Sequence, residues 1–223
     1  MNRYTTTAKK NSNNDKTFII LSDRYIPQYK YLGNYGEIIV NGKQLLSIQI
    51  EEILKSDIKA EIIVVTGYRA KYITNKSKKV RYIENVLYEE TGEVESLRLA
   101  LNANISKNVF IMSGNTMLSV KDINEMTVEN SISIRLEDDP KIAHRNMGVI
   151  YNEKNISLSM VYRCKNLWNG VVYIKEDLMD TLYNEVNKSK KTLEYCEVIK
   201  NIVNENFKVI EQKNTYKING SVL

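Results

Sequence analysis

Short apolar runs separated by amphipathic stretches place the strongest constraint on the fold. The runs FIILS (residues 18–22) and AEIIVVTGY (residues 60–68) are rich in aliphatic and β-branched residues, which is typical of strands buried on both faces. The stretch between them puts four aliphatic residues on one face of a helix: Leu46, Ile50, Ile53 and Leu54. The pattern predicts a strand-helix-strand unit.

The same alternation continues toward the middle of the chain. VRYIEN predicts a short strand, GEVESLRLALNAN a helix, and NVFIMSG the next buried strand. Strands that alternate with helices form parallel sheets with right-handed crossovers. We therefore expect residues 18–21, 62–65 and 109–112 to lie in one sheet.

The alternation of strands and helices ends after Met117. SISIRL, MGVIYN and ISLSMVYR alternate polar and apolar residues, which predicts antiparallel strands. NGVVYIKEDLMDTLYNEV predicts a strand and a helix, and a last helix over about residues 193–206 is followed by the strands FKVIEQ and TYKING. No repeat is visible, so we expect one domain over residues 17–223.

Composition limits the class of protein. A chain of 223 residues that is 43% hydrophobic can bury a substantial core. Residues 1–16 are polar and are expected to form a flexible N-terminal arm. We find no apolar core of a signal peptide and no run of roughly 18 apolar residues. The expectation is a soluble protein without membrane contact, in the cytoplasm or packaged in a virion.

Charge and cysteine content exclude further classes. The net charge of +5 comes from 32 basic and 27 acidic residues spread along the chain, which favours a solvated surface over a nucleic-acid partner. Cys164 and Cys196 are too few for a disulfide framework, and no cysteine-histidine cluster has zinc spacing. A reducing compartment is expected.

The run FIMSGNTMLSV contains a corner at residues 113–115. In α/β sheets, small and polar residues just after the carboxyl end of a buried strand lie where ligands bind. The corner, with the neutral Asn115 at its tip, is therefore a candidate site.

Four stretches resemble, in order, the nucleotidyltransferases that activate sugar-1-phosphates or choline phosphate with a nucleoside triphosphate. They are VNGKQLLSIQIEEI, EIIVVTGYRAKYI, RYIENVLYEETGEVESLRLAL and FIMSGNTML. The third is similar to the family pattern N-x-x-Y-x-x-T-x-N-x-x-S-L, and WNGVVYIKEDLMDTL is similar to the family's A-G-I-Y-V-F strand and helix. The resemblance implies a Rossmann-related, glycosyltransferase-A-like α/β domain with a mixed, mostly parallel sheet.

The chain departs from that family at the positions of the phosphates and the metal. The family's Gly-rich phosphate loop is replaced by LSDRYIPQYKYLGNYG, in which no glycine stands between Leu21 and Leu32. Arg24 and Lys30 are candidate phosphate ligands there, although single basic residues in a loop are more commonly surface charges. Asn115 and Asn219 stand where the family has metal-binding aspartates, and magnesium prefers carboxylates. We expect these two side chains to lie close together, without a metal.

The loop YEETGEVESL is the best preserved part of the resemblance. It puts Thr91, Gly92 and Ser96 at family positions near the nucleobase. A Thr-Gly turn followed by acidic residues also suits a helix N-terminus that has no ligand. The sequence leaves both interpretations open.

Two functions follow from these residues. In the first, the fold has lost catalysis, has no cofactor and serves as a binding or structural module with a protein partner, for example in a viral or phage assembly. In the second, it is an active, magnesium-dependent nucleotidyltransferase that acts on a sugar-1-phosphate or choline phosphate, with Asp23, Arg24 and Lys30 around the phosphates. The neutral pair Asn115 and Asn219 favours the first.

Overall fold

A computed structural model describes residues 16–25, 27–57, 59–73, 78–138, 147–152, 155–160, 164–212 and 216–217. The expected arm, apart from Lys16, lies outside these residues, and so does Asn219. The distance between Asn115 and Asn219 therefore stays a prediction.

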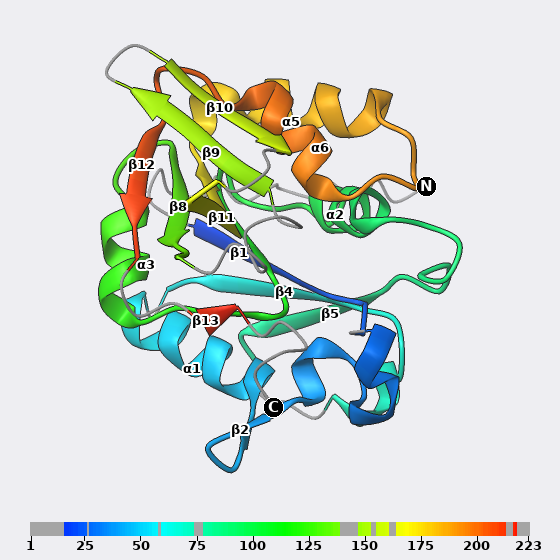
Figure 1. The fold of residues 1–223 in the computed structure, drawn as a ribbon. Coiled ribbons are helices and arrows are strands. Elements are labelled where there is room, and N and C mark those ends of the chain that lie inside the picture. The colour runs from blue at the N-terminus through cyan, green and yellow to red at the C-terminus, as the bar shows by residue number, and fades with distance from the viewer. Residues whose placement is uncertain are drawn as a thin grey trace, which may run out of the picture.

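A mixed sheet runs through the centre of the described chain (Figure 1). Its main path follows the order β10-β9-β11-β6-β1-β4-β5, and β8 pairs with both β11 and β12. The strands are β1 (Lys16–Ser22), β4 (Glu61–Thr66), β5 (Val80–Glu84), β6 (Asn108–Ser113), β8 (Ser131–Leu136), β9 (Met147–Asn152), β10 (Asn155–Met160), β11 (Asn166–Ile174) and β12 (Lys208–Glu211).

The half of the sheet built from the early strands is parallel. β1 pairs in parallel with β4 and β6, so that Ile19 lies between Ile63 and Ile111, and β4 pairs in parallel with β5. This confirms that the three apolar runs share one sheet. β1 begins at Lys16, two residues before the predicted strand FIILS, and the Lys16 ammonium lies 3.3 Å from the Asp57 carboxylate.

The later strands pair mainly in antiparallel fashion, as the alternating pattern predicts. β11 is antiparallel to β6, β8 and β9, and β9 is antiparallel to β10. β12 adds to β8 in parallel. The strand order brings β11 next to β6, which places the carboxyl end of β6 beside residues early in β11.

Helices cover both faces of the sheet (Figure 1). α1 (Leu45–Ser56) and α3 (Val120–Met126) pack on one apolar cluster, and α2 (Glu93–Leu101), α5 (Glu176–Lys188) and α6 (Tyr195–Ile202) on the other. The remaining elements are η1 (Pro27–Leu32), η2 (Tyr35–Glu37), η3 (Ala70–Tyr72), β2 (Ile39–Val40), β3 (Lys43–Gln44), β7 (Thr116–Met117) and β13 (Tyr216–Lys217). None of the described helices is long and apolar enough to cross a membrane.

The last helix is shorter than expected. α6 ends at Ile202 instead of continuing to about residue 206. The Asn204 side chain accepts a hydrogen bond from the Asn206 amide, and the Asn204 carbonyl accepts one from Phe207. Asparagine that bonds to nearby backbone favours a turn over a helix, so the chain turns here toward β12.

The corner after β6 is fixed by β1 and α1. The Gly114 amide donates to the Leu21 carbonyl at 2.7 Å, and a Cβ on Gly114 would lie only 2.6 Å from that oxygen. The buried Gln49 amide of α1 donates to the carbonyls of Gly114 and Thr116, at 3.0 and 2.7 Å. Glycine is required where the two strands meet, and Gln49 holds both sides of the corner.

Replacing Gln49 tests how much this contact stabilises the corner. Gln49→Met keeps the length of the side chain but removes the donor, which leaves two buried carbonyls unpaired. We expect the free energy of unfolding, measured by urea titration, to fall by about 2 kcal/mol. Glu51→Gln on the same helix is the control: its side chain is 46% exposed and pairs with Lys43, so the change should stay within roughly 0.5 kcal/mol. Equal effects of the two substitutions would contradict this role of Gln49.

Candidate functional site

A cavity of about 250 Å³ opens at the corner. It lies between the ends of β6 and β11, the first turns of α2 and α6, and η2. It is lined by Tyr35, Glu93, Ser113, Asn115, Met147, Met160, Trp168, Gly170, Glu194, Tyr195 and Cys196. Ser113 and Asn115, two residues of the predicted corner, thus line a cavity in the fold.

Asn115, which lines this cavity, has an unpaired amide oxygen among the described residues. The residue is 7% exposed, and its Oδ1 atom has no hydrogen-bond partner among the described residues. A buried polar atom without a partner is costly. The pairing of β13 with β7, in which Lys217 lies opposite Thr116, brings the C-terminal part of the chain beside the same corner.

Tyr195 forms one wall of the cavity. Its hydroxyl donates to the Gly170 carbonyl and lies 3.4 Å from the Ser113 hydroxyl. Burial, and secondarily the charge of Glu93, raises the pKa of Tyr195 well above its ordinary value. The phenol therefore stays neutral at physiological pH and ties α6 to β6 and β11.

The two candidate phosphate ligands have other partners. The Arg24 guanidinium donates to the Thr91 carbonyl, and it lies 3.8 Å from the Glu194 carboxylate. Lys30 lies over the rings of Tyr25 and Tyr68, with its ammonium 5.0 and 5.4 Å from the ring centroids. Neither residue lines the cavity. Arg24 links the segment after β1 to the starts of α2 and α6.

Asp23 puts a buried carboxylate directly after β1. Its Oδ2 accepts a hydrogen bond of 2.8 Å from Ser96, and its Oδ1 has no partner among the described residues. Burial raises the pKa of Asp23, and the Ser96 hydrogen bond and the Arg24 charge lower it only in part. This carboxyl group stands at the position where the family resemblance puts the Gly-rich phosphate loop.

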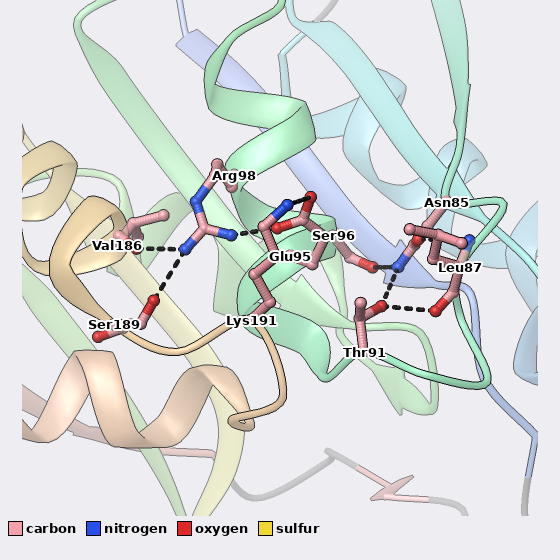
Figure 2. Close-up of polar contacts among 9 residues, drawn as sticks. All are labelled: Asn85, Leu87, Thr91, Glu95, Ser96, Arg98, Val186, Ser189 and Lys191. Carbon is pink, nitrogen blue, oxygen red and sulfur yellow. Dashed lines mark hydrogen bonds and ion pairs between the residues drawn. The ribbon is translucent and has the colours of Figure 1, made fainter.

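Asn85 and the polar residues of the loop YEETGEVESL bond to one another (Figure 2). The Asn85 amide donates to the hydroxyls of Thr91 and Ser96, at 3.0 and 2.9 Å, and Thr91 donates to the Leu87 carbonyl. Asn85 was not among the predicted site residues, although it is the first residue of the N-x-x-Y-x-x-T pattern. The hydroxyls at both family positions are therefore used within the protein.

Gly92 has a packing role. Its amide donates to the Lys191 carbonyl at 2.7 Å, the Val94 amide donates to the Leu193 carbonyl, and a Cβ on Gly92 would overlap the Leu193 carbonyl. Backbone donors in the first turn of a helix are the groups that bind anions. Here two of them are satisfied by the segment before α6. Figure 2 shows that Arg98 anchors this segment as well, through the carbonyls of Val186 and Ser189.

The residues at the corner do not fit the magnesium ion that the resemblance implies. Within the described ranges, no group of three or more His, Cys, Asp or Glu side chains is arranged to hold a metal ion. The corner offers the Asn115 amide and the Ser113 hydroxyl in place of a carboxylate.

Asp23→Asn tests whether the buried carboxylate destabilises the fold. Because the folded-state pKa of Asp23 is raised, the group favours folding below its unfolded pKa, and this contribution is lost as the pH rises through the folded pKa. Relative to wild type, Asp23→Asn should therefore gain stability in urea unfolding between about pH 4 and about pH 7. Asp180→Asn, at an exposed position of α5, should show no such trend. A variant that loses stability over this range would contradict the raised pKa.

Comparison with known proteins identifies the fold. No protein-family model and no curated protein matches the sequence. Among solved structures, CTP:phosphocholine cytidylyltransferase (LicC) from Streptococcus pneumoniae has a TM-score of 0.74 at 18% identity, covering 91% of this chain and 93% of that one. The inositol-1-phosphate CTP transferase from T. maritima has a TM-score of 0.69 at 14% identity, and the match covers 92% of each chain. HddC from Yersinia pseudotuberculosis has a TM-score of 0.66 at 16% identity, and the match covers 90% of this chain and 92% of that one. The chain thus has the α/β fold of these nucleotidyltransferase structures, with a mixed, mostly parallel sheet.

Proposed function

We propose that this protein uses a nucleotidyltransferase fold without transferring nucleotides and acts as a binding or structural module. The observation that supports this most directly is the chain of hydrogen bonds from Asp23 through Ser96 and Asn85 to Thr91. These bonds connect Asp23, which was expected near the phosphates, to Ser96 and Thr91, which were expected near the nucleobase. A nucleotide would have to break these buried bonds to use the same groups.

The charges around the cavity support the same proposal. Asp23, Glu93 and Glu194 all raise the pKa of Tyr35, after the larger effect of its burial, and the positive charge of Arg24 lowers it. Transfer of a nucleotidyl group concentrates negative charge on phosphate oxygens, which enzymes stabilise with cations and oriented donors. Carboxylates near the reacting groups would destabilise this negative charge on the phosphate oxygens.

The alternative is an active, magnesium-dependent nucleotidyltransferase. It is favoured by the coverage of the structural matches, at least 90% of both chains for the three proteins named above, and by the cavity at the expected end of the sheet. This function would require Arg24 to leave Thr91 and Glu194 and a metal to bind without the two aspartates.

For the binding module, we propose a protein partner in a cytoplasmic assembly or in a virion. Apolar residues of the antiparallel half of the sheet offer a contact surface, because Ile150, Tyr151 and Met160 are 52%, 43% and 65% exposed. The register of β9 and β10 puts Ile150 on one face and Tyr151 and Met160 on the other, so both faces of this strand pair expose apolar side chains. The expected N-terminal arm would add a second contact that becomes ordered on binding.

Pyrophosphate release tests the loss of transfer. With magnesium, a nucleoside triphosphate and either a sugar-1-phosphate or choline phosphate, the wild-type protein should show no release above background. Asn115→Asp combined with Asn219→Asp should create divalent-cation binding that calorimetry detects, because it restores two hard carboxylate ligands. Turnover should stay close to background, since the Gly-rich loop is still missing.

A matched variant shows whether cation binding depends on the position of the two new carboxylates or only on the added negative charge. Asn124→Asp combined with Asn187→Asp adds the same two charges at exposed positions of α3 and α5 and should bind no divalent cation measurably. Robust magnesium-dependent pyrophosphate release by the wild-type protein would overturn the proposed function and establish the alternative.

A further inference from the structure

β5 forms one end of the main sheet (Figure 1). It pairs in parallel with β4, which bonds to the Lys79 carbonyl at 3.2 Å and to the Asn85 amide at 2.8 Å. Because the backbone groups alternate in direction along a strand, those of Val80, Tyr82 and Glu84 point away from β4. No described strand pairs with this outer edge, and an open edge is a template for another strand.

Apolar side chains stand exposed along the same edge. Tyr82 of β5, Tyr72 of η3, and Val86 and Leu87 directly after β5 are all exposed. Tyr82 also lines a groove of about 420 Å³, together with Ile73 and other residues between β4 and β5, so there is room beside it on this face. Proteins usually keep large apolar groups away from open strand edges, which indicates that this edge is a contact surface.

The two ends of the edge carry opposite charges. Lys78 stands just before β5 and Glu84 at its end, and both residues are exposed. Neither forms an ion pair with another described residue. Arg81 lies between them, but its guanidinium is 2.7 Å from Glu61 and donates to the Ala103 carbonyl, so it is held against the protein itself. An edge that is basic at its start and acidic at its end is complementary to an antiparallel copy of itself.

We infer that β5 pairs in antiparallel fashion with β5 of a second copy of this chain, so that the two sheets join across a two-fold axis. An axis at Tyr82 puts the two Tyr82 residues opposite each other and Val80 opposite the partner's Glu84. Lys78 then lies diagonal to the partner's Glu84 on the same face, within reach of a long side chain. This symmetry favours a second copy over a different strand as the occupant of the edge.

The contact is small, because β5 has five residues. We therefore expect a weak dimer, with a dissociation constant on the order of 10 to 100 μM. The pairing goes beyond the proposed function and does not depend on whether the protein transfers nucleotides.

Sedimentation velocity of the full chain over about 1 to 300 μM tests the dimer. The wild-type protein should shift from a monomer of 25.8 kDa to a dimer as its concentration rises. Lys78→Glu and Glu84→Lys each create two like-charge contacts and should weaken the dimer at least tenfold. Lys121→Glu and Glu125→Lys make the same charge changes at exposed positions of α3 and should leave association unchanged. A wild-type protein that stays monomeric, or charge variants at β5 that associate like the wild type, would overturn the inference.

Mixing the two β5 variants tests the antiparallel arrangement. In a mixed dimer the new carboxylate of one copy meets the new ammonium of the other, and the unchanged Lys78 and Glu84 meet as well. An equimolar mixture should therefore dimerise with about the wild-type affinity, although each variant alone stays monomeric. A mixture that associates no better than the single variants would overturn the pairing, provided that unchanged melting temperatures show both variants to be folded.

A cysteine at the axis tests the register. Opposed residues of a backbone-bonded antiparallel pair have Cα atoms about 5.5 Å apart, within the range of a disulfide. Tyr82→Cys should therefore give a disulfide-linked dimer under mild oxidation. Glu84→Cys should not, because its two copies would be roughly 13 Å apart along the strands. The wild-type chain, which already has Cys164 and Cys196, measures the background. Equal cross-linking at positions 82 and 84 would overturn the pairing centred on Tyr82.

Discussion

The hydrogen bond between the Gly114 amide and the Leu21 carbonyl is the contact on which the site depends. It joins the end of the central strand β1 to the corner after β6. Two residues after Leu21, the Asp23 carbonyl accepts a hydrogen bond of 2.9 Å from the Tyr68 amide. A Cβ on Gly67 would lie 2.8 Å from the same carbonyl oxygen. The ends of β6, β1 and β4 are thereby drawn together, and glycine is needed at both contacts. The approach of these strands leaves Asp23 no access to water and puts Asn115 at the wall of the cavity.

This closeness explains why the polar groups beside β1 bond to one another. Residues that follow buried parallel strands must satisfy their polar atoms with a ligand, with water or with other side chains. Asn85 does so for Thr91 and Ser96, and Ser96 in turn donates to Asp23. One Asp23 oxygen and the Asn115 oxygen have no partner among the described residues. Incompletely satisfied buried groups occur where a protein gives up stability for function, and here they follow the ends of the two neighbouring strands β1 and β6.

The sequence predicts the scaffold better than it predicts the site. Strands buried on both faces are continuous apolar runs, so residues 18–21, 62–65 and 109–112 could be assigned to one sheet from local pattern alone. The role of Gly92 could not be read in this way, because it depends on the Leu193 carbonyl, about a hundred positions away along the chain. Arg24 is similar: its partners Thr91 and Glu194 come from two other elements. Contacts between segments far apart in sequence leave no periodic signal. Asn85, in contrast, could have been found from the N-x-x-Y-x-x-T motif that it begins.

The placement of charge around the cavity has a physical explanation that requires no metal. Glu93 lies in the first turn of α2, and Glu194 is the residue before the first turn of α6. Carboxylates at the start of a helix are stabilised by the helix dipole. Position 115 follows a strand and has no such support. An aspartate there would be a buried charge without a counter-ion, and its pKa would rise until it became neutral. The carboxylates that line the cavity therefore stand at helix starts, whereas the strand end carries a neutral amide.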